Sequence, residues 1–223
     1  MKKLSVFILT VFSFFFLSSA VPTFPAVPII IIDAGHGGED GGSSSRSGLL
    51  EKDINLEIAL KLNELCRLFG FKTVMTRETD ISIHDRSANT IRQKKNSDLN
   101  KRLDISNSHQ NSIFISIHQN IYSDPAETGV QVVYGAKNAE SAVLGRFLQQ
   151  SAKDIIDQGN RRVAKKTTGD IRILYKTGAV AAIVECGFLS NPGEAIKLTN
   201  EEYQKELAFC IINGILNFLE SRR

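Results

Sequence analysis

The stretch that decides the fold is PIIIIDAGHGG, residues 28–38. Four isoleucines follow Pro28 without a polar residue between them, which is typical of a parallel strand buried on both faces. The glycines after Asp33 predict a loop at the carboxyl end of this strand, and His36 lies within that loop. The stretch therefore predicts a buried strand that delivers a polar side chain to one edge of a sheet.

Outward from this stretch, apolar runs alternate with segments of helical spacing. We expect strands over residues 28–32, 72–76, 112–117, 129–134 and 180–184, and a further short strand over 171–174. Helices are expected over 51–68, 101–108, 139–156 and 201–220, whereas residues 82–100 are polar and predicted to be irregular. This alternation predicts an α/β fold with helices on both faces of a mostly parallel sheet.

Composition excludes several other classes of protein. The chain has 223 residues, 42% hydrophobic and 23% charged, which suits one globular domain and excludes a disordered, collagen-like or polytopic membrane protein. The net charge of +3 is small, and no basic stripe is interleaved with aromatic residues, so nucleic acid is not an expected partner. The three cysteines form neither a disulfide framework nor a CxxC metal site.

The first twenty residues have the pattern of a secretory signal. Lys2 and Lys3 precede an apolar run over residues 4–17, and small residues follow at 18–20. We expect residues 1–20 to be a signal peptide or an uncleaved N-terminal membrane anchor, residues 21–27 a linker, and residues 28–223 the working domain. In either case that domain is exported across the cytoplasmic membrane, and only the N-terminal segment contacts the membrane.

Four polar side chains are expected at one edge of the sheet. His36, His118 and Glu185 each follow an apolar strand, and Glu51 begins the first expected helix. Sites in open α/β sheets form at the carboxyl ends of strands. Two histidines and a glutamate are the ligands of a catalytic zinc that keeps a position open for water. Glu185, at the end of a buried strand, is then the candidate proton acceptor, with a pKa raised by burial.

Each of these residues also has a plainer interpretation. The glycine-rich loop can be only a turn, and it lacks the GxGxxG and GxxxxGK[ST] motifs of nucleotide sites. A histidine at a strand end can be structural, and Glu51 can be a helix N-terminal charge. Cys186 can be a nucleophile, although its apolar neighbours favour a buried structural thiol.

Four motifs together resemble the zinc-dependent N-acetylmuramoyl-L-alanine amidases of the type 3 family. They are DAGHGGEDGG at 33–42, EKDINL at 51–56, SIHQN at 116–120 and VECGFLSNP at 184–192, and the likeness extends over about residues 28–219. The resemblance implies a single domain with a twisted six-stranded sheet, one Zn²⁺ per chain held by His36, Glu51 and His118, and Glu185 as the catalytic carboxylate. It also implies peptidoglycan as substrate, cleaved between N-acetylmuramic acid and the L-alanine of the stem peptide.

The chain departs from the family pattern at two positions. Gln119 stands where many members have a small or aliphatic residue, and Cys186 replaces a more usual aliphatic residue. Both differences affect tuning of the site and not its existence. Arg102 matches an arginine that is common in the family, for which we expect a structural or substrate-orienting role, with a solvated helix charge as the alternative.

The segment IRQKKNSDL at 91–99, the small size and the N-terminal hydrophobic segment are similar to the germination-specific spore-cortex amidases. This implies a role in cortex maturation. Residues 130–166 have room for about one helix, so we expect no extra autoinhibitory helix and hypothesise control by an activating protein partner or by timing of expression. The alternatives are a vegetative autolysin with the same chemistry, a non-catalytic zinc-containing wall-binding protein, and a secreted α/β protein with a small-molecule pocket and no zinc.

Overall fold

A six-stranded sheet runs through the middle of the protein, seen here in a computed structural model that describes residues 27–223. Its order is β2-β1-β3-β6-β4-β5. The strands are β1 (Ile29–Ala34), β2 (Thr73–Met75), β3 (Ser112–Asn120), β4 (Gln131–Tyr134), β5 (Lys165–Lys166) and β6 (Val180–Phe188). β2, β1, β3 and β6 are parallel neighbours, whereas β4 is antiparallel to β6. The prediction of a mostly parallel sheet is confirmed.

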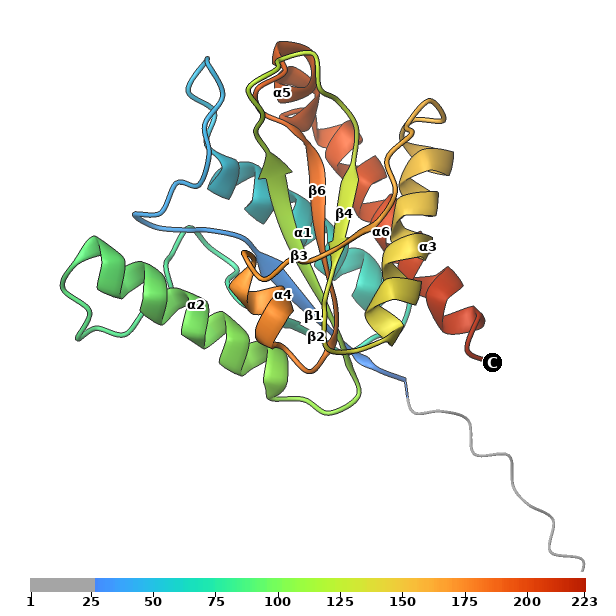
Figure 1. The fold of residues 1–223 in the computed structure, drawn as a ribbon, viewed down its shortest axis with the longest axis horizontal. Coiled ribbons are helices and arrows are strands. Elements are labelled where there is room, and N and C mark those ends of the chain that lie inside the picture. Colours follow the sequence, from blue (N-terminus) through green and yellow to red (C-terminus); the bar gives the residue numbers. More distant parts are fainter. Residues whose placement is uncertain (1–26) are drawn as a thin grey trace, which may run out of the picture.

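Helices cover both faces of this sheet, as Figure 1 shows. α1 (Glu51–Leu68), α3 (Glu140–Ile155) and α6 (Glu201–Glu220) pack together on one face, and α2 (Ile91–Asn107) and α4 (Arg172–Lys176) lie on the other. A short helix, α5 (Pro192–Leu198), follows β6. None of the helices within residues 27–223 has the length and apolar character needed to cross a membrane.

The isoleucine run of β1 explains why two layers of helices are needed. Ile30 and Ile32 belong to the larger core under α1, α3 and α6, and Ile31 belongs to the smaller core under α2 and α4. All three side chains are fully buried, and burial of each contributes about 1.5–3 kcal/mol to stability. An uninterrupted apolar run is therefore what a strand between two helical layers requires.

Two local predictions differ from the structure, and two short elements were not predicted. α2 begins at Ile91, ten residues before the expected helix at 101, because Thr90 and Gln93 form a capping box there. Residues 171–174, expected as a strand, lie mostly in α4, since a short apolar run does not distinguish the two structures. β5 and α5 were not expected from the sequence.

The parallel strands bring the expected site residues to one edge. Ala34 of β1 pairs in register with Ile117 of β3, and His118 pairs with Glu185 of β6. The chain before α1 folds back toward this edge, because the Glu51 backbone N–H donates to the Ser43 carbonyl at 2.9 Å. The N-terminal expectations for residues 1–20, and for the linker up to residue 26, lie outside the described residues.

Candidate metal centre

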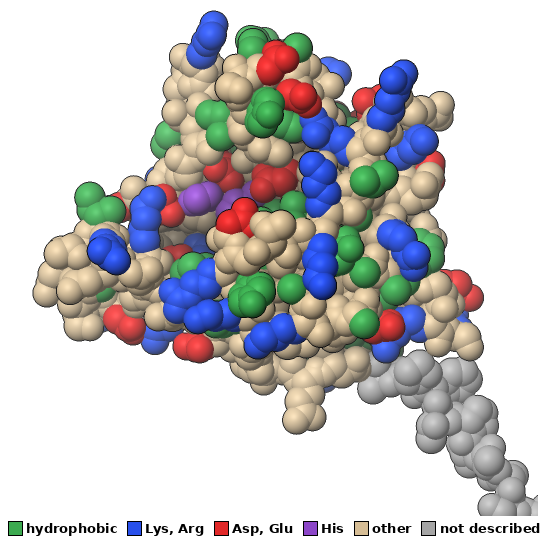
Figure 2. All heavy atoms as spheres, viewed as in Figure 1, with side chains coloured by type: hydrophobic (Ala, Val, Ile, Leu, Met, Phe, Trp, Pro, Cys, Tyr) green, Lys and Arg blue, Asp and Glu red, His purple; other side chains and the backbone are tan. Residues whose placement is uncertain are grey.

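Three side chains from separate elements meet at the carboxyl edge of the sheet. His36 follows β1, Glu51 begins α1 and His118 lies in β3, and each offers one ligand atom within 4.8 Å of the other two. Glu51 Oε1 lies 3.3 Å from His36 Nε2 and 2.9 Å from His118 Nδ1. Figure 2 shows histidine side chains in a hollow of the surface, with acidic side chains beside them.

His36 reaches the cluster through an uncommon backbone conformation. Its φ of 61° lies in the left-handed region, which no other non-glycine residue among those described adopts. Asp40 bonds the far side of the imidazole, with 2.9 Å between its Oδ2 and His36 Nδ1. This contact holds Nε2 toward Glu51, as a carboxylate behind a metal-ligating histidine does.

Glu51 is buried at the centre of the cluster and is held by donors from three segments. The Ser43 N–H donates to Oε2 at 2.8 Å, and the Gln119 N–H donates to Oε1 at 3.1 Å. Asn55, one turn along α1, donates to Oε1 at 3.4 Å and to the Gly35 carbonyl at 3.1 Å. The carboxylate is therefore fixed in place and is more than a solvated helix charge.

Gly35 and Gly42 have no side chain, and this leaves the space in which the three ligand side chains approach one another. A Cβ at Gly35 would lie 2.3 Å from His118 Nε2, and a Cβ at Gly42 would lie 2.7 Å from both Glu51 Oε2 and His36 Cδ2. The glycine-rich loop thus has a specific steric purpose at these two positions.

Glu185 lies next to the cluster on β6. Its Oε2 is buried and has no hydrogen-bond partner among the described residues. Burial raises the pKa of Glu185 to about 7, the nearby His118 lowers it and the charge on Glu51 raises it. A carboxyl that exchanges a proton near neutral pH is suited to general acid–base chemistry.

The charges of the cluster favour a cation. Burial opposes ionisation of Glu51, yet hydrogen bonds and charges from His118 and His36 hold its pKa well below the usual range. Burial likewise opposes protonation of His36, but Asp40 and Glu51 raise the pKa of His36 to about 9. The carboxylates of Asp40 and Glu51 thus place negative charge beside the two imidazoles, and this charge stabilises a cation at the site.

This donor set fits a zinc ion. Two imidazole nitrogens and one carboxylate oxygen are borderline ligands that suit zinc, and three protein ligands leave a position for water. The side chains of His36 and His118 keep 25% and 22% of their surface exposed, so the cluster is open to solvent on one side.

Other candidates from the sequence lie apart from the cluster or are buried. His84 bonds Ser82, and His109 bonds Ser108. Cys186 is fully buried and burial raises its pKa well above the usual value, as expected of a structural thiol and not of a nucleophile. Gln119, one of the departures from the family pattern, bonds Glu51 through its backbone N–H, and its side chain donates to Asn55 Oδ1 at 3.1 Å.

Sequence reasoning missed three supporting residues: Asp40, Asn55 and Arg77, whose Nη2 donates to the Gly35 carbonyl at 3.1 Å and to the Lys52 carbonyl at 2.7 Å. Asp40 and Asn55 each lie four positions after a ligand, and Arg77 follows the end of β2, as His36 follows β1. Spacing of four on a helix was the available signal for Asn55, and the position after a strand end was the signal for Arg77, whereas Asp40 lies in a loop for which periodicity offers no signal.

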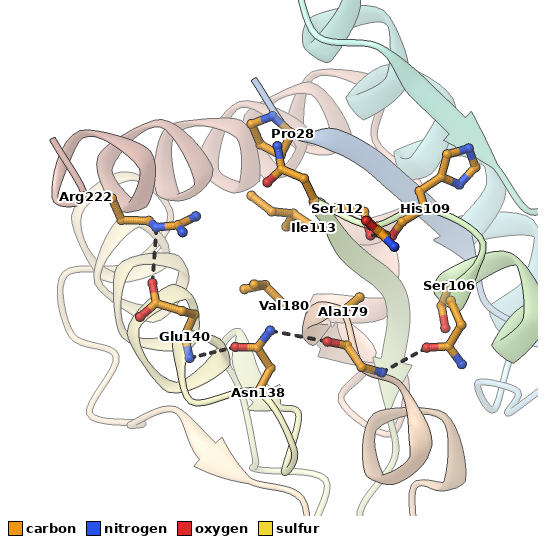
Figure 3. Close-up of a pocket in the computed structure, with 14 residues that line it drawn as sticks. Pro28, Ser106, His109, Ser112, Ile113, Asn138, Glu140, Ala179, Val180 and Arg222 are labelled. Carbon is orange, nitrogen blue, oxygen red and sulfur yellow. Dashed lines mark hydrogen bonds and ion pairs between the residues drawn. The ribbon is translucent and has the colours of Figure 1, made fainter. Parts of the chain in front are cut away.

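A second hollow, of about 390 Å³, lies at the opposite end of the sheet (Figure 3). Ile113 and Val180, near the starts of β3 and β6, contribute to its lining. Its polar groups bond one another, for example Arg222 with Glu140 at 3.2 Å, and it holds no cluster of metal-binding side chains among those described. Among the described residues, the candidate metal-binding side chains therefore lie at the carboxyl edge of the sheet and not at the opposite end.

Comparisons with known proteins agree with this geometry. Residues 30–217 match the N-acetylmuramoyl-L-alanine amidase family Amidase_3. The germination-specific N-acetylmuramoyl-L-alanine amidase of Bacillus subtilis (strain 168) is 33% identical over 194 residues, which cover 87% of this chain and 81% of that protein.

Two solved structures share the fold at similar coverage. The CwlD amidase of Clostridioides difficile, in complex with the GerS lipoprotein, has a TM-score of 0.84 and 37% identity over 87% of this chain and 99% of that one. An N-acetylmuramoyl-L-alanine amidase from Clostridium difficile 630 has a TM-score of 0.75 and 30% identity over 88% and 99%. The sheet and helices described above are therefore those of this group.

Proposed function

Because the chain belongs to the N-acetylmuramoyl-L-alanine amidase family, we propose that His36, Glu51 and His118 hold one zinc ion and that Glu185 transfers the proton in catalysis. The enzyme is a peptidoglycan hydrolase that cleaves the amide between N-acetylmuramic acid and L-alanine. The observation that carries the assignment of residues is the meeting of three ligand atoms within 4.8 Å, with Glu185 the register partner of His118.

The protein's own groups divide the work of amide hydrolysis. When bound, zinc lowers the pKa of a water molecule and polarises the scissile carbonyl. Glu185 accepts the proton of the attacking water and passes it to the leaving amine of L-alanine. Asp40 orients His36, while Ser43, Gln119 and Asn55 hold Glu51, so that neither ligand has to be ordered during the reaction.

The test is digestion of peptidoglycan by the purified protein, with and without a chelator, followed by mass spectrometry of the products. We expect free L-alanine N-termini on released stem peptides, loss of release with chelator and recovery with zinc. Bound zinc without any release would favour a wall-binding protein, and absence of bound zinc would contradict the site.

We also propose that spore-cortex peptidoglycan is the working substrate. The support is the likeness to the germination-specific amidase and to the CwlD amidase, each over more than four-fifths of this chain. Parallel digestion of cortex and vegetative peptidoglycan distinguishes this role from that of a general autolysin, which would release peptides from both at similar rates.

Control by a protein partner is a further part of the proposal. The CwlD amidase was solved bound to the GerS lipoprotein. Between Val130 and Lys166 the described structure has one helix, α3, and so no additional element of helical length to cover the site. Full activity of the purified chain without any added protein would count against an activating partner.

Export of the enzyme follows from its substrate, which lies outside the cytoplasmic membrane. Lys2, Lys3 and the apolar run over 4–17 are the proposed export signal. The mass of the protein recovered from an expressing cell distinguishes a cleaved signal, with loss of about 20 residues, from a retained anchor.

A further inference from the structure

We propose that Arg77 and Arg102 act as positioning residues, which together tie the three ligand-bearing segments into one rigid frame. We call this pair the two-arginine hub. The inference rests on the metal site of the proposed function and extends it to residues that lie beneath the ligands. Both guanidiniums are buried, with exposed fractions of 2% and 4% for the two residues.

Arg77 links the loop of His36 to the helix of Glu51. Its Nε donates to the Ala34 carbonyl at 2.9 Å, and its Nη2 donates to the Gly35 carbonyl at 3.1 Å. The same Nη2 donates to the Lys52 carbonyl at 2.7 Å, in the first turn of α1. Its remaining hydrogen bond also goes to a carbonyl, that of Thr79 at 3.2 Å. The hydrogen bonds of this buried guanidinium therefore all go to backbone carbonyls.

Arg102 links the same loop to the strand of His118. Its Nη2 donates to the His36 carbonyl at 2.7 Å, and its Nη1 donates to the Ala34 carbonyl at 2.8 Å. Nη1 also pairs with buried Asp33, whose second oxygen accepts from Ser116 Oγ at 2.6 Å. Ser116 lies two residues before His118 on β3, so the chain of contacts reaches the third ligand.

The two guanidiniums together bind three successive carbonyls, those of residues 34, 35 and 36. This fixes the peptide planes on both sides of Gly35 and holds His36 at its positive φ. A guanidinium can do this because its five donors form a rigid planar fork, whereas a lysine ammonium is a single flexible point charge. Arginine, and not positive charge alone, is what the frame requires.

The experiment compares zinc binding by Arg77→Lys, Arg102→Lys and the double variant, using the full chain. Affinity is measured by competition with a chromophoric chelator, and ligand geometry is followed by the absorption spectrum of the Co²⁺-substituted protein. We expect each single variant to bind zinc about 10–100-fold more weakly and to change the cobalt spectrum. Both arginines bond the Ala34 carbonyl, so the effects of the two substitutions are coupled. The fold loss of zinc affinity in the double variant should therefore be smaller than the product of the two single losses.

The matched control is Arg222→Lys, an arginine paired with Glu140 at the opposite end of the sheet (Figure 3). It should leave zinc affinity and the cobalt spectrum unchanged. If Arg102→Lys fails to fold, Arg77→Lys decides the matter, since it leaves the pair of Arg102 with Asp33 intact. A folded Arg77→Lys protein with the affinity and spectrum of the wild type would overturn the hub, whereas a wild type that binds no zinc would instead refute the proposed function.

Discussion

His118 and Glu185 are register partners on the neighbouring parallel strands β3 and β6. One belongs to the metal cluster, and the other carries a buried carboxyl oxygen without a hydrogen-bond partner among the described residues. The sheet itself therefore sets the spacing between ligand and proton acceptor, since register in a buried sheet is strongly specified by its apolar pattern.

Glu185→Gln tests the role of this carboxyl. Glutamine keeps the shape of the side chain but cannot accept a proton, so zinc content should be unchanged and the turnover of peptidoglycan should fall about 10²–10⁴-fold. Zinc is measured by elemental analysis and turnover by released peptides. The control, Glu57→Gln, alters an exposed glutamate of α1 and should leave both quantities unchanged. Turnover at the wild-type rate would remove Glu185 from the mechanism.

The pH dependence of kcat/KM should have an acidic limb that belongs to Glu185. Burial raises the pKa of this group to about 7, and a cation bound beside it lowers that pKa, so the limb should lie at or below about pH 7. Activity should rise with pH through this limb, because the acceptor must be ionised. The residual activity of Glu185→Gln should lack the limb, and an identical limb in that variant would assign the titration to another group.

The histidines of the chain provide an internal comparison. His36→Ala and His118→Ala each remove one ligand and should abolish stoichiometric zinc binding, while His84→Ala and His109→Ala should retain it, since these two lie outside the cluster. Zinc per chain after dialysis is the measurement. Unchanged zinc in His36→Ala or His118→Ala would contradict the ligand assignment.

The site was predictable from sequence to the extent that it depends on where strands end. Apolar runs placed His36, His118 and Glu185 at one edge, and the structure brings the first two together with Glu51. The supporting contacts were not predictable in this way. Asp40 reaches His36 only because the intervening loop turns back, with Gly37 and Asp40 bonded to each other through their backbones.

The elements that were missed share a physical cause. The apolar residues of α2 that pack against the core, Leu99, Leu103 and Ile105, all lie in its C-terminal half, so residues 91–98 have no apolar face to indicate a helix, and the capping box was the remaining signal there. β5 consists of two exposed lysines that pair with β4 at the sheet edge, so its conformation is imposed by the neighbouring strand. Such segments are determined by tertiary contacts, which periodicity does not record.

Gly35→Ala should disturb the site by steric contact alone. The added Cβ would lie 2.3 Å from His118 Nε2, so the imidazole must move and zinc binding should weaken, with a cost in stability of about 1–3 kcal/mol. Gly41→Ala, in the same loop, is the matched control because its Cβ would meet only Leu50, at 3.5 Å. Zinc affinity and thermal unfolding of both variants provide the measurement. Equal behaviour of the two proteins would show that the loop tolerates a side chain beside His118.

Asp33→Asn tests the buried pair beneath the site. Burial raises the pKa of Asp33, but Arg102, Ser116, His118 and Thr76 outweigh burial and lower it below 3.8. A carboxyl whose folded pKa is lowered contributes stability that is fully present above its unfolded pKa and is lost as pH falls through the folded pKa. The substitution removes this partner but leaves the pair of Arg102 Nε with Asp98 Oδ1 at 2.6 Å, so the free energy of unfolding at pH 7 should fall by about 1–3 kcal/mol.

The difference between wild type and Asp33→Asn should then narrow progressively as pH falls below about 4, because the carboxyl of the unfolded wild-type chain becomes protonated there, while the folded carboxyl stays ionised down to its lowered pKa. Urea unfolding at several pH values measures this difference. Asp104→Asn, an exposed aspartate of the same helix as Arg102, is the control and should change stability by less than about 0.5 kcal/mol. A deficit of the same size at pH 3 and pH 7 would mean that the loss comes from altered packing, and the ionised pair with Arg102 would not be its source.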